Sequence, residues 1–191
     1  MKRAQTSVEI NEVLANRHSP RSLDAAALLS RQDLLAILEA ARWAPSASNG
    51  QPWRFFIGHR GDEVFAQILD SLVSFNQGWA HRASVLILVA GVHTREDGKA
   101  HKGFEYDCGL AVGQMVVETH HRGFVAHQMT GFDAEKAGKN LGIDASLTPL
   151  AVVAIGKQAP AELLQGAMLE RENAPRARKP LEEIVVKGLP N

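Results

Sequence analysis

Hydrophobic residues recur along the chain with two spacings, one typical of helices and one typical of buried strands. The clearest helical spacing lies in LLSRQDLLAILEAARWA, where apolar residues return every three or four positions from Leu34 to Ala41. Ser30 precedes this pattern and Asp33 follows three residues later, as in a capped helix N-terminus. We expect Pro45 to stop the helix, because proline lacks the amide hydrogen that a helix interior needs.

The same reasoning predicts the other elements. Residues 84–92 are apolar over the length of one strand, which predicts a strand buried on both faces. The segment FEYDCGLAVGQMVVETHHRGF predicts a helix that is apolar on most sides, and therefore central or at an interface. The remaining predictions are a helical stripe over Val8, Ile10, Val13 and Leu14, strands over 53–57, 125–130 and 150–155, helices over 64–72 and near 133–140, and a C-terminal helical turn followed by a last short strand. Alternating helices and strands predict a mixed α and β class, and 191 residues predict one domain spanning 1–191.

The composition of the chain argues against several classes of protein. Lys+Arg and Asp+Glu both number 21, so the formal net charge is zero, which argues against a broad nucleic-acid surface but not against a local basic pocket. The single cysteine, Cys108, excludes an internal disulfide framework and a cysteine zinc cage. The N-terminal stretch has no apolar core of a secretory signal, and no apolar run approaches the roughly 20 residues of a membrane span. We therefore expect a cytoplasmic protein.

Three polar segments could carry chemistry. In NRHSPRS, Arg17, Ser19 and Arg21 offer two guanidinium groups and a hydroxyl suited to a phosphate, although a solvated basic turn is the simpler alternative. In WAPSASNGQPWRFF, small residues over 45–50 are either a plain turn or a backbone that lies flat against a ligand. In PRARK, residues 175–179, a basic run is either a solvated face or part of an anion site.

Common catalytic signatures are missing from the sequence. Neither G-x-G-x-x-G after a strand nor G-x-x-x-x-G-K-[ST] occurs, and H-E-x-x-H and G-x-S-x-G are also missing. His120 and His121 are adjacent on a predicted helix and do not face each other, so we do not expect a shared metal. Cys108 on an apolar helix is expected to be a small core residue rather than a nucleophile.

Together the three segments resemble the FMN-dependent nitroreductase family. The resemblance is carried by Arg-His-Ser-x-Arg, then a helix, then Pro-Ser-x-x-Asn-x-Gln-Pro-Trp, then a late Arg-x-Arg. SFNQGWAHRASVLILV, GFVAHQMTGFD, AVVAIGKQ and RKPLEEIV are similar to further segments of the family, so the resemblance covers nearly the whole chain. It implies an α+β fold, with a nitroreductase-like sandwich in which helices flank a central mixed sheet. It also implies an intertwined homodimer that exchanges C-terminal arms and holds FMN at its interface.

The resemblance further implies roles for individual residues. Arg17, His18 and Ser19 would hold the phosphate and ribityl chain, and Arg176 and Arg178 would complete the phosphate site. The other implied positions are Arg21 on the N1–C2 carbonyl side of the ring, Asn76 at the ring or ribityl edge, Thr130 and Gly131 near N5, Pro45, Ser46 and Ala47 of the partner along the flavin face, and Asn49 in the turn that follows.

The implied activity is hydride transfer from NADH or NADPH through flavin N5 to nitroaromatics, quinones or similar conjugated electrophiles, with ping-pong kinetics. Two alternatives stay open: other chemistry on the same flavin, such as dehalogenation or flavin cleavage, and a non-catalytic FMN-binding protein. Some family members carry Lys where Arg21 stands and Glu where Thr130 stands. Residues 93–106 occupy the position of a variable lid and are short and polar, which predicts an open active site.

Overall fold

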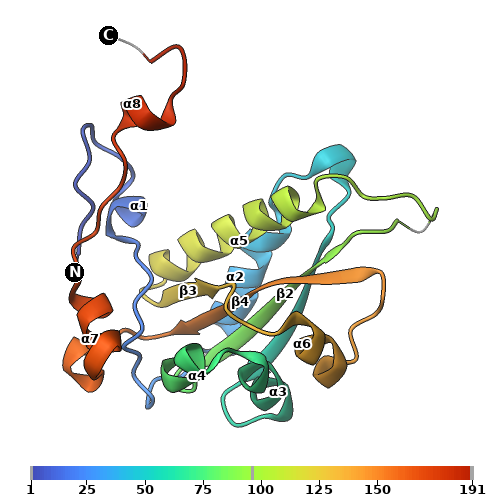
Figure 1. Cartoon of the computed structure of the whole chain (residues 1–191), viewed down its shortest axis with the longest axis horizontal. Coiled ribbons are helices and arrows are strands. Elements are labelled where there is room, and N and C mark those ends of the chain that lie inside the picture. Colours follow the sequence, from blue (N-terminus) through green and yellow to red (C-terminus); the bar gives the residue numbers. More distant parts are fainter. Residues whose placement is uncertain (1, 96, 190–191) are drawn as a thin grey trace.

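A four-stranded sheet forms the centre of the molecule (Figure 1). The computed structural model describes residues 2–95 and 97–189. The strands lie in the order β1-β2-β4-β3, and each neighbouring pair is antiparallel. Their bounds are β1 Trp53–His59, β2 Val85–Val92, β3 Val125–Met129 and β4 Leu147–Gly156, so the four strands predicted between residues 53 and 155 are confirmed, with later or earlier ends.

The predicted mixed sheet is wrong in one respect, because the sheet formed by the described residues is antiparallel throughout. The chain leaves β2, crosses the sheet through a long helix, and enters β3 in the direction of β2. A parallel pair would need these two strands to be neighbours. Instead β4 lies between them and pairs with both in the opposite direction.

Helices cover both faces of the sheet (Figure 1). The α-helices are α1 Glu12–Asn16, α2 Arg31–Arg42, α3 Glu63–Ser71, α4 Ser74–Ala80, α5 Phe104–His121, α6 Ala134–Leu141, α7 Gly166–Asn173 and α8 Leu181–Ile184. The cap predicted for α2 is confirmed, because the Ser30 side chain accepts a hydrogen bond from the Asp33 amide. No helix in the described ranges is long and apolar enough to cross a membrane.

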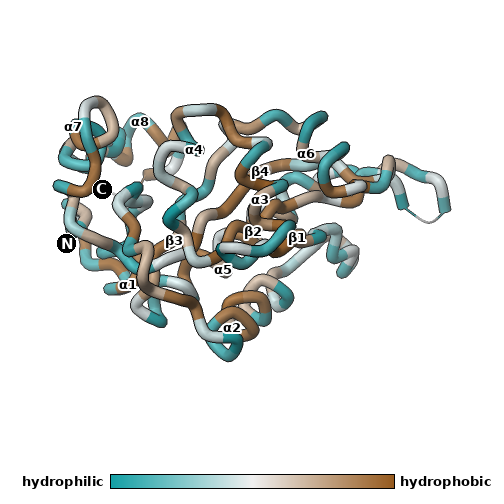
Figure 2. Tube along the Cα trace, turned by 90° about the horizontal axis from the view of Figure 1, so that it is seen from below, coloured by the Kyte–Doolittle hydropathy of each residue, from teal (hydrophilic) through white to brown (hydrophobic). Residues whose placement is uncertain are grey.

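The central strand β2 divides the core into two layers. Val85, Ile87 and Val89 pack with residues of α2 and α5 on one face. Leu86 and Leu88 pack with residues of α3, α4 and α6 on the other. Because successive strand side chains point to opposite faces, an uninterrupted apolar strand requires apolar cover on both sides. Figure 2 shows the hydrophobic strands enclosed between the helices, as the apolar run predicted.

The two ends of the chain differ from the sequence predictions. The predicted N-terminal stripe is a helix only from Glu12, and Val8 and Ile10 are exposed ahead of it. No strand follows α8 within residues 185–189, and Val186 is 96% exposed. A strand needs a neighbouring strand to pair with, and the C-terminal segment extends away from the sheet (Figure 1). Helices α4 and α7 were not predicted.

The layered core gives a stability prediction for α2. Ile37 is fully buried against the sheet, whereas Leu35 on the same helix is about half exposed. We expect Ile37→Ala to lower the free energy of unfolding by about 2–5 kcal/mol, because it removes buried methyl groups and leaves a cavity. Leu35→Ala, as the matched control, should change it by no more than about 0.5 kcal/mol. Urea denaturation measures both, and equal losses would contradict the orientation of α2.

Candidate functional site

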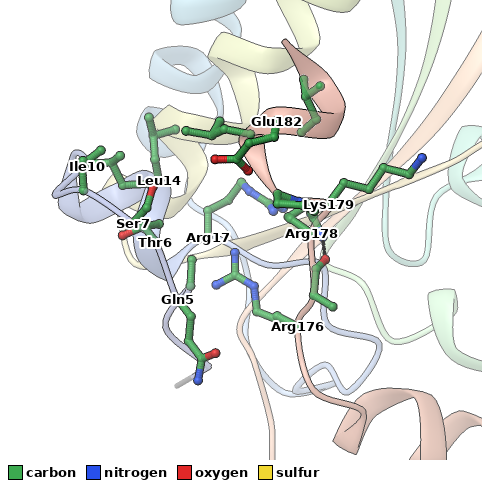
Figure 3. Close-up of a pocket in the computed structure, with 16 residues that line it drawn as sticks. Gln5, Thr6, Ser7, Ile10, Leu14, Arg17, Arg176, Arg178, Lys179 and Glu182 are labelled. Carbon is green, nitrogen blue, oxygen red and sulfur yellow. Dashed lines mark hydrogen bonds between the residues drawn. The ribbon is translucent and has the colours of Figure 1, made fainter. Parts of the chain in front are cut away.

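A basic cavity lies between the N-terminal segment and the C-terminal arm. Its volume is about 720 Å³, and Arg17, Arg176 and Arg178 line it together with Lys179. Figure 3 shows the three arginine side chains gathered at its centre. Burial lowers the pKa of Arg17, and the charges of the other two guanidinium groups lower it further. The structure therefore brings together the first and third polar segments, which are about 160 residues apart in the sequence, in a place that favours an anion.

The three arginines have different hydrogen-bond partners. Nη1 of Arg176 donates to the carbonyl of Ala15 at 2.8 Å and to the carbonyl of Lys2 at 2.5 Å. Within residues 2–95 and 97–189, Arg17 makes one long side-chain contact, 3.4 Å from Nη1 to Ser19 Oγ, and the Arg178 side chain donates only to the carbonyl of its neighbour Ala177. Arg176 therefore ties the arm to the N-terminal segment, while Arg17 and Arg178 keep most of their donors for a ligand.

Two histidines lie beside this cavity. His18 is partly buried, and its Nδ1 donates to the Asn16 carbonyl at 3.3 Å; burial lowers its pKa. His120, at the end of α5, lies under Arg17 and His18, and burial together with those charges lowers its pKa to about 4. Its Nε2 accepts a long hydrogen bond of 3.4 Å from the Ala126 amide. His120 is therefore neutral near pH 7, and it lies close to Arg17 and His18 at the end of α5.

Arg21 lies in a second, adjoining part of the site. Its amide N–H donates to Oε2 of the buried Glu172 at 2.8 Å. Burial lowers the pKa of its guanidinium, and its Nε is buried without a hydrogen-bond partner among the described residues. Next to it, His127 donates from Nδ1 to the Pro20 carbonyl at 3.1 Å and packs on Trp79, with ring centroids 4.6 Å apart.

Asn76 and Gly131, predicted from separate segments, meet in the structure. Nδ2 of Asn76 donates to the Gly131 carbonyl at 3.0 Å, and the Val73 amide donates to the same carbonyl at 3.1 Å. A Cβ atom at Gly131 would lie 2.8 Å from Asn76 Nδ2, so any larger residue would displace that side chain. Thr130 is exposed beside this contact. Asn76 and Gly131 therefore pack tightly against each other.

The turn after α2 is strained. Ser48, Asn49 and Gln51 have φ angles of 53°, 54° and 43°, and they are the non-glycine residues with positive φ in the described chain. Side chains disfavour this conformation by about 1–2 kcal/mol per residue, with Asn the least affected. Strain of this kind gathers at functional sites, where the surrounding contacts maintain it.

Several contacts hold this turn in place. Ser46 Oγ accepts from the Gln51 amide at 3.0 Å, and Oδ2 of the buried Asp107 accepts from the Ala47 amide at 3.1 Å. Gly50 packs on the buried His101 so closely that a Cβ atom there would lie 2.7 Å from its Nε2. The turn is therefore fixed to the start of α5 and to the segment before it, with Pro45, Ala47 and Asn49 exposed.

The strained turn and the basic cavity lie at opposite ends of α5. Asp107 holds the turn near the helix start, and His120 supports Arg17 at its end. At about 1.5 Å per residue, these two helix positions are about 20 Å apart. Within one chain, the structure therefore joins Arg17, His18 and Ser19 to the arm, but it does not bring Pro45–Asn49 to them.

Some residues of the site carried no signal in the sequence. Glu172 and Asp107 are each one of several acidic residues in their helices, and His127 lies in the short strand VAHQM without a motif. Only their contacts with segments more than 50 residues away reveal them. The predicted lid, residues 93–106, contains no helix before Phe104 among its described residues and extends beyond the end of the sheet (Figure 1).

The model of the Nitroreductase family matches residues 14–75 and 62–157 of this chain. The chain belongs to the Nitroreductase family. An uncharacterized 15.4 kDa protein of Mycolicibacterium smegmatis is 34% identical over 142 residues, which cover 71% of this chain and 95% of that protein. The major NAD(P)H-flavin oxidoreductase of Aliivibrio fischeri is 34% identical over 89 residues, 44% of this chain and 40% of that protein.

A solved structure supports the same assignment, both by its fold and by its sequence identity. A crystal structure of an oxidoreductase containing FMN is 33% identical, covers 97% of this chain and 94% of its own, and superposes with a TM-score of 0.90. The sequence resemblance to this family is therefore confirmed, and so is the α+β fold with helices flanking a central sheet.

The histidines of this nitroreductase-family protein predict a pH effect. Burial lowers the pKa of His127 to about 4, as it does for His120. An unfolded histidine titrates near 6.5, so the unfolded chain binds protons first as the pH falls, and stability is lost between about pH 6.5 and pH 4. His127→Gln should flatten this loss, measured by urea denaturation at pH 7 and pH 5. His121→Gln, at an exposed histidine, is the control, and an equal flattening there would contradict the prediction.

Proposed function

We propose that this protein is an FMN-dependent NAD(P)H oxidoreductase that reduces nitroaromatics, quinones or similar conjugated electrophiles, with the chain 1–191 acting as a single FMN-binding domain. The observation that carries the proposal is the basic cavity of Arg17 and Arg178, followed four residues along the chain by the half-buried Arg21. One segment of chain thus offers cations to a phosphate and, further on, to a polar ring edge. Family membership and the FMN-containing structural relative favour the same ligand.

The described residues fit FMN. Arg17 and Arg178 would hold the phosphate, with Ser19 and His18 beside it, and Arg176 would hold the arm in position. The Nε of Arg21 is buried and has no hydrogen-bond partner within the described chain. Another N–H group of the same guanidinium would donate to an acceptor on the edge of the flavin ring. Asn76 would lie at the ring or ribityl edge, and Gly131 allows this side chain its position because a Cβ there would lie 2.8 Å from Asn76 Nδ2.

When bound, FMN supplies the hydride chemistry at N5, so that electrons pass from NAD(P)H to the acceptor. Arg21 contributes a fixed positive charge, which stabilises negative charge that develops on the ring. The protein needs no nucleophile for this reaction. Burial raises the pKa of Cys108 to about 12, so its thiol stays protonated and is not available as one.

We further propose that the site is completed by a second copy of the chain. The strained turn, with Pro45, Ser46, Ala47 and Asn49, lies about 20 Å from Arg17 along α5 and would cover the ring bound by the partner. The C-terminal arm leaves the body of its own chain, with Leu181, Ile184 and Val186 exposed. An exchanged arm would bury these side chains on the partner. A cytoplasmic location, where NAD(P)H is available, suits this activity.

The first test is the visible spectrum of the purified protein, followed by anaerobic addition of NADH and then NADPH. We expect a yellow protein whose flavin band bleaches. A yellow protein that stays oxidised, and that oxidises neither nucleotide in the presence of menadione, would instead be a flavin-binding protein without this activity. A colourless protein that cannot be reconstituted with FMN would refute the proposal.

Site variants test where FMN binds. Arg17→Ala and Arg178→Ala should each weaken FMN binding by about 1.5–3 kcal/mol, because each removes charge-assisted hydrogen bonds to the phosphate. Binding is measured by fluorescence as FMN is titrated into the apoprotein. Lys139→Ala, at an exposed cation in the last turn of α6 that does not line the cavity, is the control. Unchanged affinity in both site variants would remove the cavity from the FMN site.

The dimeric arrangement has its own test. Ser46→Trp should block the ring site, because the bulky side chain projects from the wall that we assign to the partner. Because both substitutions remove the hydrogen bond from the Gln51 amide to Ser46 Oγ, Ser46→Ala, which adds no bulk, is the control, and it should keep FMN at a thermal unfolding midpoint similar to that of Ser46→Trp. Full FMN occupancy in Ser46→Trp, or FMN retention by a protein that is monomeric in analytical ultracentrifugation, would contradict a site built from two copies.

A further inference from the structure

Two arginines from distant segments place their guanidinium groups over one aromatic ring. Cζ of Arg21 lies 5.8 Å from the centroid of the Phe75 ring, and Cζ of Arg171 lies 4.6 Å from it. Arg171 belongs to the last turn of α7, and no sequence motif marks it. Phe75 and Asn76 both belong to α4, so the helix that carries the ring between the two cations also carries the Asn76–Gly131 contact.

The positive charge around Phe75 is not balanced by an ion pair within the described part of the chain. Oε2 of Glu172 accepts from the Arg21 amide. Burial lowers the pKa of Arg21, the charge of Glu172 raises it, and the charge of Arg171 lowers it further. Neither Arg21 nor Arg171 belongs to a salt bridge among the described residues. Like charges held around one ring repel each other unless an anion joins them.

Donors around the ring also remain available. The Nε of Arg21 is buried without a partner, and Arg171 is exposed, with no side-chain hydrogen bond to another described residue. A planar guanidinium group offers several N–H donors in a geometry that matches a phosphate or a carboxylate. This place is separate from the basic cavity, which is lined by Arg17, Arg176 and Arg178 and not by Arg21 or Arg171.

We propose that Arg171, held over Phe75 with Arg21 beside the same ring, forms a subsite for an anionic group on the molecule that exchanges electrons at the flavin, while Arg21 serves the ring edge. The inference rests on the proposed function, because it places that molecule beside Asn76 and Gly131. A phosphate or a carboxylate would fit equally. The anion therefore has two sources, the 2′-phosphate that distinguishes NADPH from NADH and a carboxylate on the acceptor.

Calorimetric titration of the FMN-loaded protein separates these sources. The probes are 2′,5′-ADP against 5′-AMP, which differ by the 2′-phosphate, and 4-nitrobenzoate against 4-nitrobenzamide, which differ in charge. In one of the two pairs, we expect Arg171→Ala to weaken binding of the probe with the additional anionic group about ten-fold, which is the loss of one charge-assisted contact. Binding of the other probe of that pair should not change. Arg171→Glu should weaken it further, and Arg171→Lys should restore part of the affinity.

The matched control is Arg42→Ala. Arg42 is also an exposed arginine over an aromatic ring, 5.1 Å from the centroid of Trp43, but it lies at the end of α2. An effect confined to 2′,5′-ADP assigns the subsite to the nucleotide and predicts a preference for NADPH that Arg171→Ala abolishes. An effect confined to 4-nitrobenzoate assigns it to the acceptor.

The remaining outcomes are also decisive. If no probe distinguishes Arg171→Ala from the parent protein, or if Arg42→Ala has the same effect, the subsite does not exist, while an FMN spectrum that bleaches with NAD(P)H still supports the proposed function. If the protein holds no FMN, the same titration is made on the protein as purified. Arg171-dependent binding of a charged probe would then retain the anion subsite and reject the flavin.

Discussion

Helix α5 fixes the distance on which the whole site depends. It packs against α2 and the sheet along most of its length, so neither of its ends can move independently of the core. Asp107 near its start holds the strained turn, and His120 at its end lies under Arg17. A rigid spacer of this length keeps the strained turn and the arginines of the cavity apart within one chain. In the dimer that we propose, the same spacing lets the turn of one chain cover the site of the other.

Side-chain contacts from Ser46 and Asp107 maintain the strained turn. Left-handed backbone at Ser48 and Gln51 opposes folding, and isolated peptides of this sequence would not hold it. Ser46 Oγ and the Asp107 carboxylate satisfy amides that the turn would otherwise leave unpaired. Each of these bonds contributes about 0.5–1.5 kcal/mol, so together they offset part of the cost of the left-handed residues. The core therefore stabilises a conformation whose outer surface, with Pro45 and Ala47, stays free for a ligand or a second chain.

Much of the fold could be predicted from the sequence, because the dominant signals were local. The apolar run before Val92 could only be a doubly covered strand, and Ser30 marked the start of α2. The order of the strands was not predictable, since the insertion of β4 between β2 and β3 depends on pairing across the whole chain. Helix α4 was missed because Gly78 and polar residues interrupt its apolar spacing.

The residues of the candidate site can be divided in the same way, into those with a local sequence signal and those without one. Arg17, Arg178, Asn76 and Gly131 belong to motifs, so the sequence identified them before any contact was known. Their roles in the structure are less uniform, since Arg176 is committed to two backbone carbonyls while Arg178 is not. Nothing local marked Glu172, although it accepts from the Arg21 amide across 151 positions of sequence.

Electrostatics explains why such a neutral chain can hold so concentrated a site. The formal charge is zero because acids and bases balance over the whole sequence, yet three arginines and Lys179 line the cavity with one acidic residue, Glu182, and none of these arginines forms a salt bridge among the described residues. Like charges around a cavity raise the free energy of the ligand-free protein, and an anion that enters recovers it. Glu172 belongs to this balance. Its carboxylate accepts from the Arg21 amide, and its negative charge raises the pKa of the Arg21 guanidinium against the lowering by burial, so Glu172 anchors this segment and balances part of that charge.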